Sequence, residues 1–367
     1  MKEKPSVSVQ IINWNGVRFL KDCFDSLLKQ DYPNFELVLV DNGSKDGSIK
    51  FIKESYDKEI KSGRIRIEVL KKNYGLAEGY NISYSRCTSD YVLLINNDTI
   101  SPEKNLISNM VARAEKDRSI ALVGASIYPF NTNLKKIKSV ERPGTLSLAL
   151  TNTLRYLKGN KVFYVSGCCC LIRKELIDCP FDGDYFAYSE DVYLGWKSIL
   201  MDYSNVQEPT ARILHYGSGT SGTGSPFVRY YAERNRILNC LIFYEGSTLI
   251  KILPLLLIYS LVAGAFFLQR PKVFFSFLKA HLWIITHPIK IIKKRNAVQK
   301  YRKISDSKVL GMLSTEIFLM ETKITSFYIS LRKRKTAMRF IEHFSKLLNR
   351  AVKLYSGAVG LKTIDTK

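Results

Sequence analysis

The chain of 367 residues is 46% hydrophobic, a composition that excludes global disorder and allows one large α/β domain with a smaller appendage. Its net charge is +23, and residues 269–367 hold most of the excess, with 22 Lys and Arg against 5 Asp and Glu. So basic a tail predicts an anionic partner, either nucleic acid or an acidic lipid surface. Because no nucleic-acid recognition motif accompanies the charge, we expect the lipid surface and no nucleic acid.

The cysteines and the N-terminus indicate a cellular compartment. Seven cysteines, an odd number without a CxxC pair, argue against a disulfide framework or a zinc site and favour a reducing compartment. Three of them, Cys168, Cys169 and Cys170, are predicted to fill a buried strand as small apolar residues. The apolar run after the charged first five residues is short and interrupted, so it predicts a strand rather than a signal peptide. We therefore expect the N-terminal domain in the cytosol.

Four short apolar runs are predicted strands: residues 7–12, 36–40, 64–70 and 91–95. Segments with helical spacing separate them, and the first carries Val17, Leu20, Phe24, Leu27 and Leu28. This alternation predicts an α/β fold with a doubly wound, mostly parallel sheet. From about residue 120 to 216 the pattern changes to scattered strands with longer loops, which we interpret as an extension of the same domain.

Doubly wound sheets bind ligands at the carboxyl ends of their strands. Here all four predicted ends are polar: residues 13–15, 41–44, 72–75 and 96–98. Asp41 ends the second strand, where its carboxylate could accept hydrogen bonds from a nucleobase or a ribose. The alternative is an ordinary Asx-turn.

A metal site is predicted after the fourth strand, where Asn96 and Asn97 precede Asp98. A carboxylate beside an amide suits a hard divalent cation that keeps waters and bridges phosphate oxygens, whereas the alternative is a polar turn. His215 is predicted to end a later strand, and a neutral imidazole there could complete the metal site. The glycine-rich run 217–222 could close over phosphates, although it lacks the P-loop pattern.

Two neighbouring acids, Glu190 and Asp191, precede an apolar helical pattern, and Ser189 is a predicted N-cap. The helix dipole would favour their ionised forms, as a general base at neutral pH requires. The alternative is that they are simple capping acids.

Seven sequence blocks in order resemble those of the family 2 glycosyltransferases. They are VQIINWNG at 9–16, DNGSKDGS at 41–48, NYGLAEGYN at 73–81, LINND at 94–98, SGC at 166–168, FD at 181–182 and EDVYLGW at 190–196. The resemblance covers roughly residues 5–240. It is closest to rhamnosyltransferase-like members, which build cell-surface polysaccharides.

The resemblance implies a GT-A fold and a role for each candidate residue. Donor binding falls to Asn13, Asn15, Asp41, Asn42, Gly75 and Asn96, with Asp41 contacting the base. Residues 96–98 stand at the DxD position, so that Asp98, with His215, would hold Mg or Mn. Asp191 would be the catalytic base, with Glu190 beside it.

Two departures from the family pattern matter. The first acid of DxD is Asn96, which leaves metal affinity mainly to Asp98. The QxxRW motif of processive synthases is not evident, which favours single-sugar addition.

The resulting hypothesis is an inverting, non-processive glycosyltransferase of the hexosyltransferase type. It would move a sugar from a nucleotide-diphosphate sugar to a lipid-linked or cell-surface glycan acceptor. Two alternatives stay open, a transferase acting on polyprenyl phosphate and a non-catalytic, membrane-bound scaffold that only binds nucleotide sugars.

The tail sets the predicted domain division, with a catalytic domain over residues 1–245 and membrane-associated helices over 246–367. Residues 252–268 are uncharged, but a bilayer span needs about 20 apolar residues, and residues 273–289 contain Lys279. A single span would also place the basic tail outside, against the positive-inside bias. We therefore expect basic amphipathic helices in the interface at the cytoplasmic face of the cell membrane. The alternative is an ordinary buried helix pair with a solvated basic face.

Overall fold

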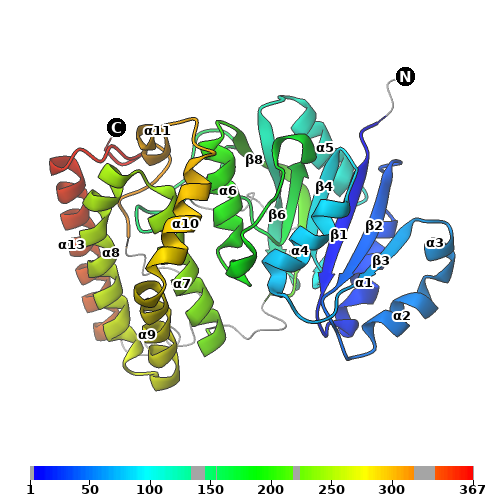
Figure 1. The fold of residues 1–367 in the computed structure, drawn as a ribbon, viewed down its shortest axis with the longest axis horizontal. Coiled ribbons are helices and arrows are strands. Elements are labelled where there is room, and N and C mark those ends of the chain that lie inside the picture. The colour runs from blue at the N-terminus through cyan, green and yellow to red at the C-terminus, as the bar shows by residue number, and fades with distance from the viewer. Residues whose placement is uncertain (1–3, 134–144, 154, 218–223, 318–334, 367) are drawn as a thin grey trace. The chain divides into compact units, whose positions relative to one another are not determined.

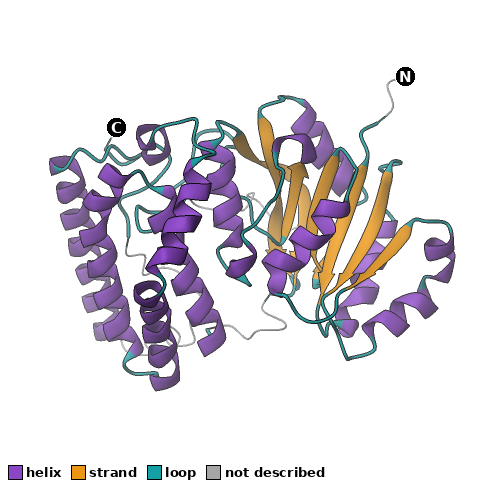
Figure 2. Cartoon of the chain, in the orientation of Figure 1, coloured by secondary structure: helices purple, strands orange, loops and turns teal. Residues whose placement is uncertain are grey.

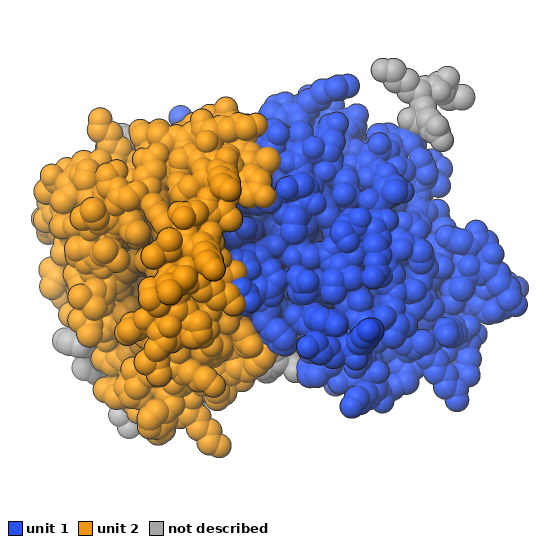
Figure 3. Space-filling view, viewed as in Figure 1, with its two compact units in different colours: residues 1–143, 158–198, 203–220 blue, residues 144–157, 199–202, 221–367 orange. Residues whose placement is uncertain are grey.

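A computed structural model describes residues 4–133, 145–153, 155–217, 224–317 and 335–366. The chain forms two compact units, coloured separately in Figure 3. The first comprises Met1–Pro143, Lys158–Ser198 and Tyr203–Thr220, and the second comprises Gly144–Leu157, Ile199–Asp202 and Ser221–Lys367. Each unit is described by itself below.

The first unit is built on a sheet whose described strands follow the order β3-β2-β1-β4-β7-β6-β8-β5 (Figures 1 and 2). The strands are β1 (Val7–Asn13), β2 (Phe35–Asp41), β3 (Ile65–Val69), β4 (Tyr91–Asn96), β5 (Thr99–Ile100), β6 (Ile120–Pro129), β7 (Cys169–Arg173) and β8 (Ser204–His215). β1 runs parallel to both β2 and β4, and β2 runs parallel to β3. The doubly wound N-terminal half predicted from the sequence is therefore confirmed.

The second half of the sheet mixes directions. β7 is antiparallel to both β4 and β6, β6 is parallel to β8, and the short β5 is antiparallel to β8. Cys169 and Cys170 lie in β7, and with Cys168 they are buried as the sequence predicted.

Helices cover both faces of the sheet. They are α1 (Val17–Leu28), α2 (Ser48–Ser55), α3 (Asp57–Lys61), α4 (Gly75–Arg86), α5 (Leu106–Glu115) and α6 (Glu190–Leu200), with short 3-10 turns η2 (Lys174–Leu176) and η3 (Gly183–Tyr185). Val9 and Ile11 of β1 lie in a core with Leu20 of α1 and Met110 of α5. On the opposite face α4 packs over β1 and β2 (Figure 1). β1 is buried on both faces, with Val9 and Ile11 on the α1 and α5 side, although Ser8 and Gln10 interrupt its apolar run.

The second unit is mainly helical (Figure 2). Its helices are α7 (Pro226–Phe243), α8 (Gly246–Phe267), α9 (Pro271–Thr286), α10 (Pro288–Gln299), α11 (Asp306–Leu310) and α13 (Lys335–Ala358). α7 packs against α8, α9 and α10. Arg295 and Gln299 of α10 donate to the last carbonyls of α7, those of Leu241, Ile242 and Phe243, and so cap that helix end.

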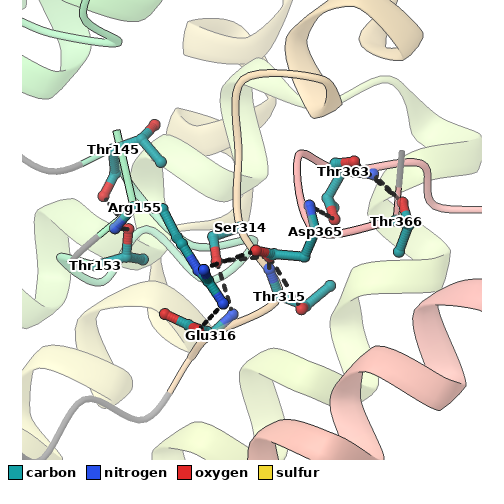
Figure 4. Close-up of polar contacts among 9 residues, drawn as sticks. All are labelled: Thr145, Thr153, Arg155, Ser314, Thr315, Glu316, Thr363, Asp365 and Thr366. Carbon is teal, nitrogen blue, oxygen red and sulfur yellow. Dashed lines mark hydrogen bonds and ion pairs between the residues drawn. The ribbon is translucent and has the colours of Figure 1, made fainter. Parts of the chain in front are cut away.

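A polar junction ties the last residues of the chain to this unit (Figure 4). The Asp365 carboxylate accepts hydrogen bonds from Ser314 Oγ at 2.7 Å and from the Thr315 N–H at 2.6 Å, and it pairs with Arg155 at 3.2 Å. Arg155 also pairs with Glu316 at 2.6 Å. The junction joins three segments that are far apart in the sequence.

Among the described residues, α8 is the one helix long and apolar enough to cross a membrane, with a mean hydropathy of 2.2. It contains the predicted uncharged run. The predicted domain division falls between α7 and α8, whereas the second compact unit takes in α7 as well. The functional division after residue 245 stays a prediction.

Candidate active site

The carboxyl ends of β1 and β4 meet where the strand order reverses, because the chain leaves β1 for β2 on one side and returns to β4 on the other. Ligands of open α/β sheets bind at such a switch point. Asn13 bridges it. Its Nδ2 donates to Asp41 Oδ2 at 3.0 Å, and its Oδ1 accepts from Asn97 Nδ2 at 2.6 Å. Three polar ends predicted from the sequence are thus joined in one network.

The loops beside this network are held by their own side chains. Asp41 is buried and accepts from the Ser44 N–H at 2.9 Å, so the predicted Asx-turn is present on one carboxylate oxygen. Asn15 adopts a φ of 50° and accepts from the Lys45 N–H at 2.8 Å. Gly16 is required because an added Cβ would lie 2.1 Å from Asn97 Nδ2. Both loops are therefore fixed in place at the switch point.

Asn42 ties the second strand to the loop before α4. Its Nδ2 donates to the Gly75 carbonyl at 2.9 Å, and its Oδ1 accepts from the Tyr74 N–H at 2.9 Å. Gly75 has a φ of 83°, and a Cβ there would lie 2.7 Å from the Cα of Phe186. We call residues 72–75 the donor loop, after the role that the resemblance implied for Gly75. This loop is positioned by Asn42 on one side and by Phe186 on the other.

Asp98 and His215 come together although 117 positions separate them in the sequence. Pairing of β5 with β8 sets Thr99 opposite His215, and Asp98 Oδ1 lies 3.2 Å from His215 Nε2. The Tyr216 N–H donates to the Asp98 carbonyl at 3.0 Å, which fixes the end of β8 against this turn.

This pair fits a divalent cation, since it offers one carboxylate oxygen and one imidazole nitrogen, and Asp98 directly follows Asn97 of the network. Within the described ranges no group of three or more His, Cys, Asp or Glu could hold a metal. Asn96 Oδ1 is buried and lacks a hydrogen-bond partner among the described residues. A cation here would take its other ligands from phosphate or water.

The acids Glu190 and Asp191 begin α6, as predicted. Asp191 accepts from the Val192 N–H at 2.8 Å and from the Gly167 N–H at 3.4 Å. A Cβ on Gly167 would lie 3.4 Å from Glu190 Oε1, so that glycine borders both carboxylates. Glu190 Oε2 is buried and has no hydrogen-bond partner in the described part of the chain.

The predicted ionisation of both acids is wrong for Glu190. Burial raises its pKa to about 8, and the neighbouring charge of Asp191 adds to the rise. Burial also raises the pKa of Asp191, against the backbone hydrogen bonds that favour its ionised form. At neutral pH the pair therefore holds a protonated Glu190 beside Asp191, the more exposed of the two.

Comparisons with known proteins identify the family of the N-terminal part of the chain. The family model "Glycosyl transferase family 2" matches residues 8–181. Residues 8–181 are a family 2 glycosyltransferase domain. Glu190, Asp191 and His215 lie beyond the matched residues.

Two relatives of this domain come from Bacillus subtilis. The chain is 32% identical over 151 residues to the putative glycosyltransferase EpsE of Bacillus subtilis, covering 40% of this chain and 53% of EpsE. It is 28% identical over 152 residues to the putative teichuronic acid biosynthesis glycosyltransferase TuaG of the same species, covering 41% of this chain and 59% of TuaG. The chain thus spans less than two thirds of these relatives.

The solved structures establish the fold. GalNAc-T7 with UDP, GalNAc and Mn2+ superposes with a TM-score of 0.56 at 15% identity, over 67% of this chain and 49% of that one. The mannosyltransferase PcManGT from Pyrobaculum calidifontis, in complex with GDP-Man and Mn2+, superposes with a TM-score of 0.51 at 13% identity. The match covers 97% of this chain and 87% of that one. The first unit has the GT-A fold that the resemblance implied.

Sequence reasoning missed three contributors to the site. Asn97 was counted in the metal triplet, yet its side chain binds Asn13. Gly167 was quoted only as part of a block, and it donates to Asp191. Phe186, which contacts Gly75, carries no local signal. The glycine-rich run after His215 lies outside the described residues from Ser218 onward.

Proposed function

We propose that this protein is an inverting, non-processive glycosyltransferase that moves one sugar from a nucleotide-diphosphate sugar to a glycan or lipid-linked acceptor. One observation carries the proposal: the Asp98–His215 pair and the Glu190–Asp191 pair occur with a polar network in one GT-A unit. The Mn2+ complexes of two structurally similar proteins, one with GDP-Man and one with UDP and GalNAc, support the donor class and the cation.

Donor recognition would begin at the switch point. The buried Asp41 carboxylate accepts hydrogen bonds, and Asn13 fixes its orientation. We propose that Asp41 contacts the base or ribose and that Asn15, Asn42, Gly75 and Asn96 line the donor beside it. A cation held by Asp98 and His215 would neutralise the charge that develops on the departing diphosphate.

Proton transfer would fall to Asp191. The acceptor hydroxyl oxygen attacks the anomeric carbon from the face opposite the diphosphate and forms the new glycosidic bond. The bond from that carbon to the diphosphate oxygen breaks, and Asp191 takes the hydroxyl proton. The hydrogen bonds from Gly167 and Val192 hold the Asp191 carboxylate in place. The protonated Glu190 adds no second negative charge near neutral pH.

The second unit carries an apolar surface that suits a membrane interface. α8 and α9 each present large side chains that are 44–73% exposed: Ile250, Leu253, Leu257, Leu261, Phe275, Leu278, Leu282 and Ile285. Their spacing of three and four positions makes one stripe per helix. α13 repeats the pattern with Phe344, Leu347 and Leu354. Exposed apolar patches of this kind mark interaction sites.

Basic residues accompany these stripes. Lys251 of α8, Lys272 and Lys279 of α9, and Lys290 and Lys293 of α10 are exposed. Apolar stripes with cationic flanks favour an anionic lipid interface over a second protein. We therefore propose that these helices lie in the cytoplasmic face of the cell membrane, where a lipid-linked or cell-surface glycan acceptor would be met.

A donor screen tests the proposed function. UDP-, GDP- and dTDP-sugars are compared for thermal stabilisation of the purified protein, with and without Mn2+, and the binders are then assayed for donor consumption. We expect one nucleotide class to stabilise the protein in the presence of Mn2+ and to be turned over. Binding without turnover in the presence of lipid or glycan acceptors would favour the non-catalytic scaffold instead.

A further inference from the structure

The residues just before the acid pair have an unusual backbone. We call residues 181–189 the strap. Within it Phe186, Tyr188 and Ser189 have φ values of 60°, 67° and 61°, although none of them is glycine. Positive φ is uncommon for non-glycine residues and a true outlier for bulky ones. Such strain persists only where the surrounding structure enforces it, and it clusters at functional sites.

The tightest point of the strap is a γ-turn at Phe186. Its φ of 60° and ψ of −61° match the rare, strained form of this turn. The Ala187 N–H donates across it to the Tyr185 carbonyl at 2.6 Å. The turn leaves the Phe186 carbonyl pointing at a neighbouring helix.

That helix is α4, which holds the strap at two points. At the near end the Leu76 N–H donates to the Phe186 carbonyl at 2.5 Å. At the far end the side chain of Asn81 pairs with the backbone of Phe181 in both directions. Its Nδ2 donates to the carbonyl at 2.9 Å and its Oδ1 accepts from the N–H at 3.1 Å. The strap is thus anchored before it turns.

The same turn touches the donor loop. Gly75 packs so closely that an added Cβ would lie within 2.7 Å of the Phe186 backbone. The carbonyl of Gly75 in turn accepts a hydrogen bond from the side chain of Asn42, just after β2. A displacement at the donor loop would therefore reach the strap through backbone contacts, with no flexible side chain between them.

At its other end the strap runs directly into α6. The Ser189 carbonyl accepts the first hydrogen bond of the helix, from the Tyr193 N–H at 3.1 Å, and the two acids follow at once. Ser189, the last of the strained residues, is followed directly by Glu190 and Asp191. The backbone that carries these carboxylates therefore starts directly from the strap.

We propose that the strap is a positioning element that sets Glu190 and Asp191 relative to the donor loop, with Asn81 and the Phe186 turn as its attachments to α4. The inference rests on the proposed function, in which Asp191 is the base. Asn81 is a positioning residue here, because it acts on the carboxylates only through the chain.

The test is Asn81→Ala in the full-length protein, with donor affinity from calorimetry and kcat measured across pH. We expect kcat to fall about 10- to 100-fold, as a misplacement of about 1 Å can cost, while donor affinity stays within twofold. We also expect the rising limb of kcat against pH to move to lower pH. A loosened strap admits water to the carboxylates and lowers their pKa values.

Asn109→Ala is the matched control. Asn109 is also a half-buried asparagine on a helix, and its Nδ2 donates to a distant backbone carbonyl, that of Thr210, at 3.3 Å. It should leave kcat and the pH limb unchanged. If Asn81→Ala does not fold, Asn81→Asp is read in the same way, because its carboxylate can still accept from the Phe181 N–H but cannot donate to the Phe181 carbonyl.

The outcomes separate this inference from the proposed function. Wild-type protein that turns over its donor while Asn81→Ala keeps the same kcat and the same limb overturns the strap alone. If Asn81→Ala lowers kcat without shifting the rising limb of the pH profile, and Asn109→Ala lowers kcat equally, the role of Asn81 is purely structural. That result also overturns the strap. A wild-type protein that binds nucleotide sugars but never turns them over overturns the proposed function, and the strap's role with it.

Discussion

The Oδ1 atom of Asp98 lies 3.2 Å from Nε2 of His215, and Asp98 is the sole carboxylate of its triplet. Without a cation the two side chains can satisfy each other. Asp98 and His215 would together hold a divalent cation, and donor phosphate and water would supply its remaining ligands. Metal binding and donor binding are therefore expected to be mutually dependent.

The first prediction follows from this pair. Asp98→Ala should lower donor affinity in Mn2+ by at least about tenfold, since even outer-shell changes at metal sites typically cost 10- to 100-fold. Asn96→Ala should have a smaller effect, because its amide oxygen lies outside the Asp98–His215 pair. Calorimetric donor titrations with and without Mn2+ measure both. Equal wild-type affinity in the two conditions would remove the metal assignment.

The second prediction concerns the base. Asp191→Asn keeps the shape of the side chain but cannot accept the proton. We expect kcat to fall by about 10²–10⁴-fold with donor affinity nearly unchanged. Glu190→Gln is the matched comparison, because Glu190 is protonated at neutral pH and its amide analogue is also neutral. Transfer by Asp191→Asn within threefold of wild type would exclude Asp191 as the base.

The third prediction uses the raised pKa of Glu190. In the folded state this carboxyl keeps its proton up to about pH 8, whereas the unfolded chain loses it near its ordinary value of 4.5. Between these values the folded state binds more protons, so the free energy of unfolding falls as pH rises. The slope is about 1.4 kcal/mol per pH unit at most.

Urea denaturation at pH 5, 6.5 and 8 measures this slope. Wild-type protein should lose stability relative to Glu190→Gln as pH rises, because glutamine cannot titrate. Parallel curves for the two proteins across this range would mean that Glu190 is solvated in the folded state.

The sequence predicted the strands of the first half because β1, β2 and β4 are buried on both faces and therefore rich in apolar residues, although Ser8 and Gln10 interrupt β1 and Glu36 interrupts β2. It also predicted polar residues at the carboxyl ends of these strands, and in the structure two of them, Asn13 and Asp41, are hydrogen-bonded. The insertion of β7 between β4 and β6 could not be predicted, because pairing between segments so distant leaves no local pattern.

Burial explains the error at the acids. A helix N-terminus stabilises a negative charge by about 0.3–1 kcal/mol, and this can be inferred from Ser189 and the helix that follows. Burial of a carboxylate can raise its pKa by several units and therefore outweighs the dipole at Glu190. The backbone of the strap could not be predicted from the sequence either, because Phe and Tyr, the residues at 186 and 188, do not indicate a positive φ.

The last prediction concerns the apolar stripes of the second unit. The full-length protein should float with anionic liposomes and be only partly released by high salt, since salt screens the lysines but not apolar burial. Each Lys or Arg near an anionic leaflet contributes about 1 kcal/mol. The paired change Leu261→Gln with Ile285→Gln replaces two side chains that are 66% and 73% exposed. We expect it to reduce flotation in high salt strongly while leaving the fold intact, because neither side chain is in the core.

Val69→Gln is its control, since Val69 is 61% exposed on β3 of the first unit, away from the stripes. It should float as wild type does. Neutral liposomes separate the two contributions: the protein should bind them more weakly than anionic ones, and the paired variant should bind them hardly at all. Wild-type protein that floats with neither liposome would show that the stripes do not enter lipid. If wild type and the paired variant float equally in high salt, a surface other than these stripes makes the membrane contact.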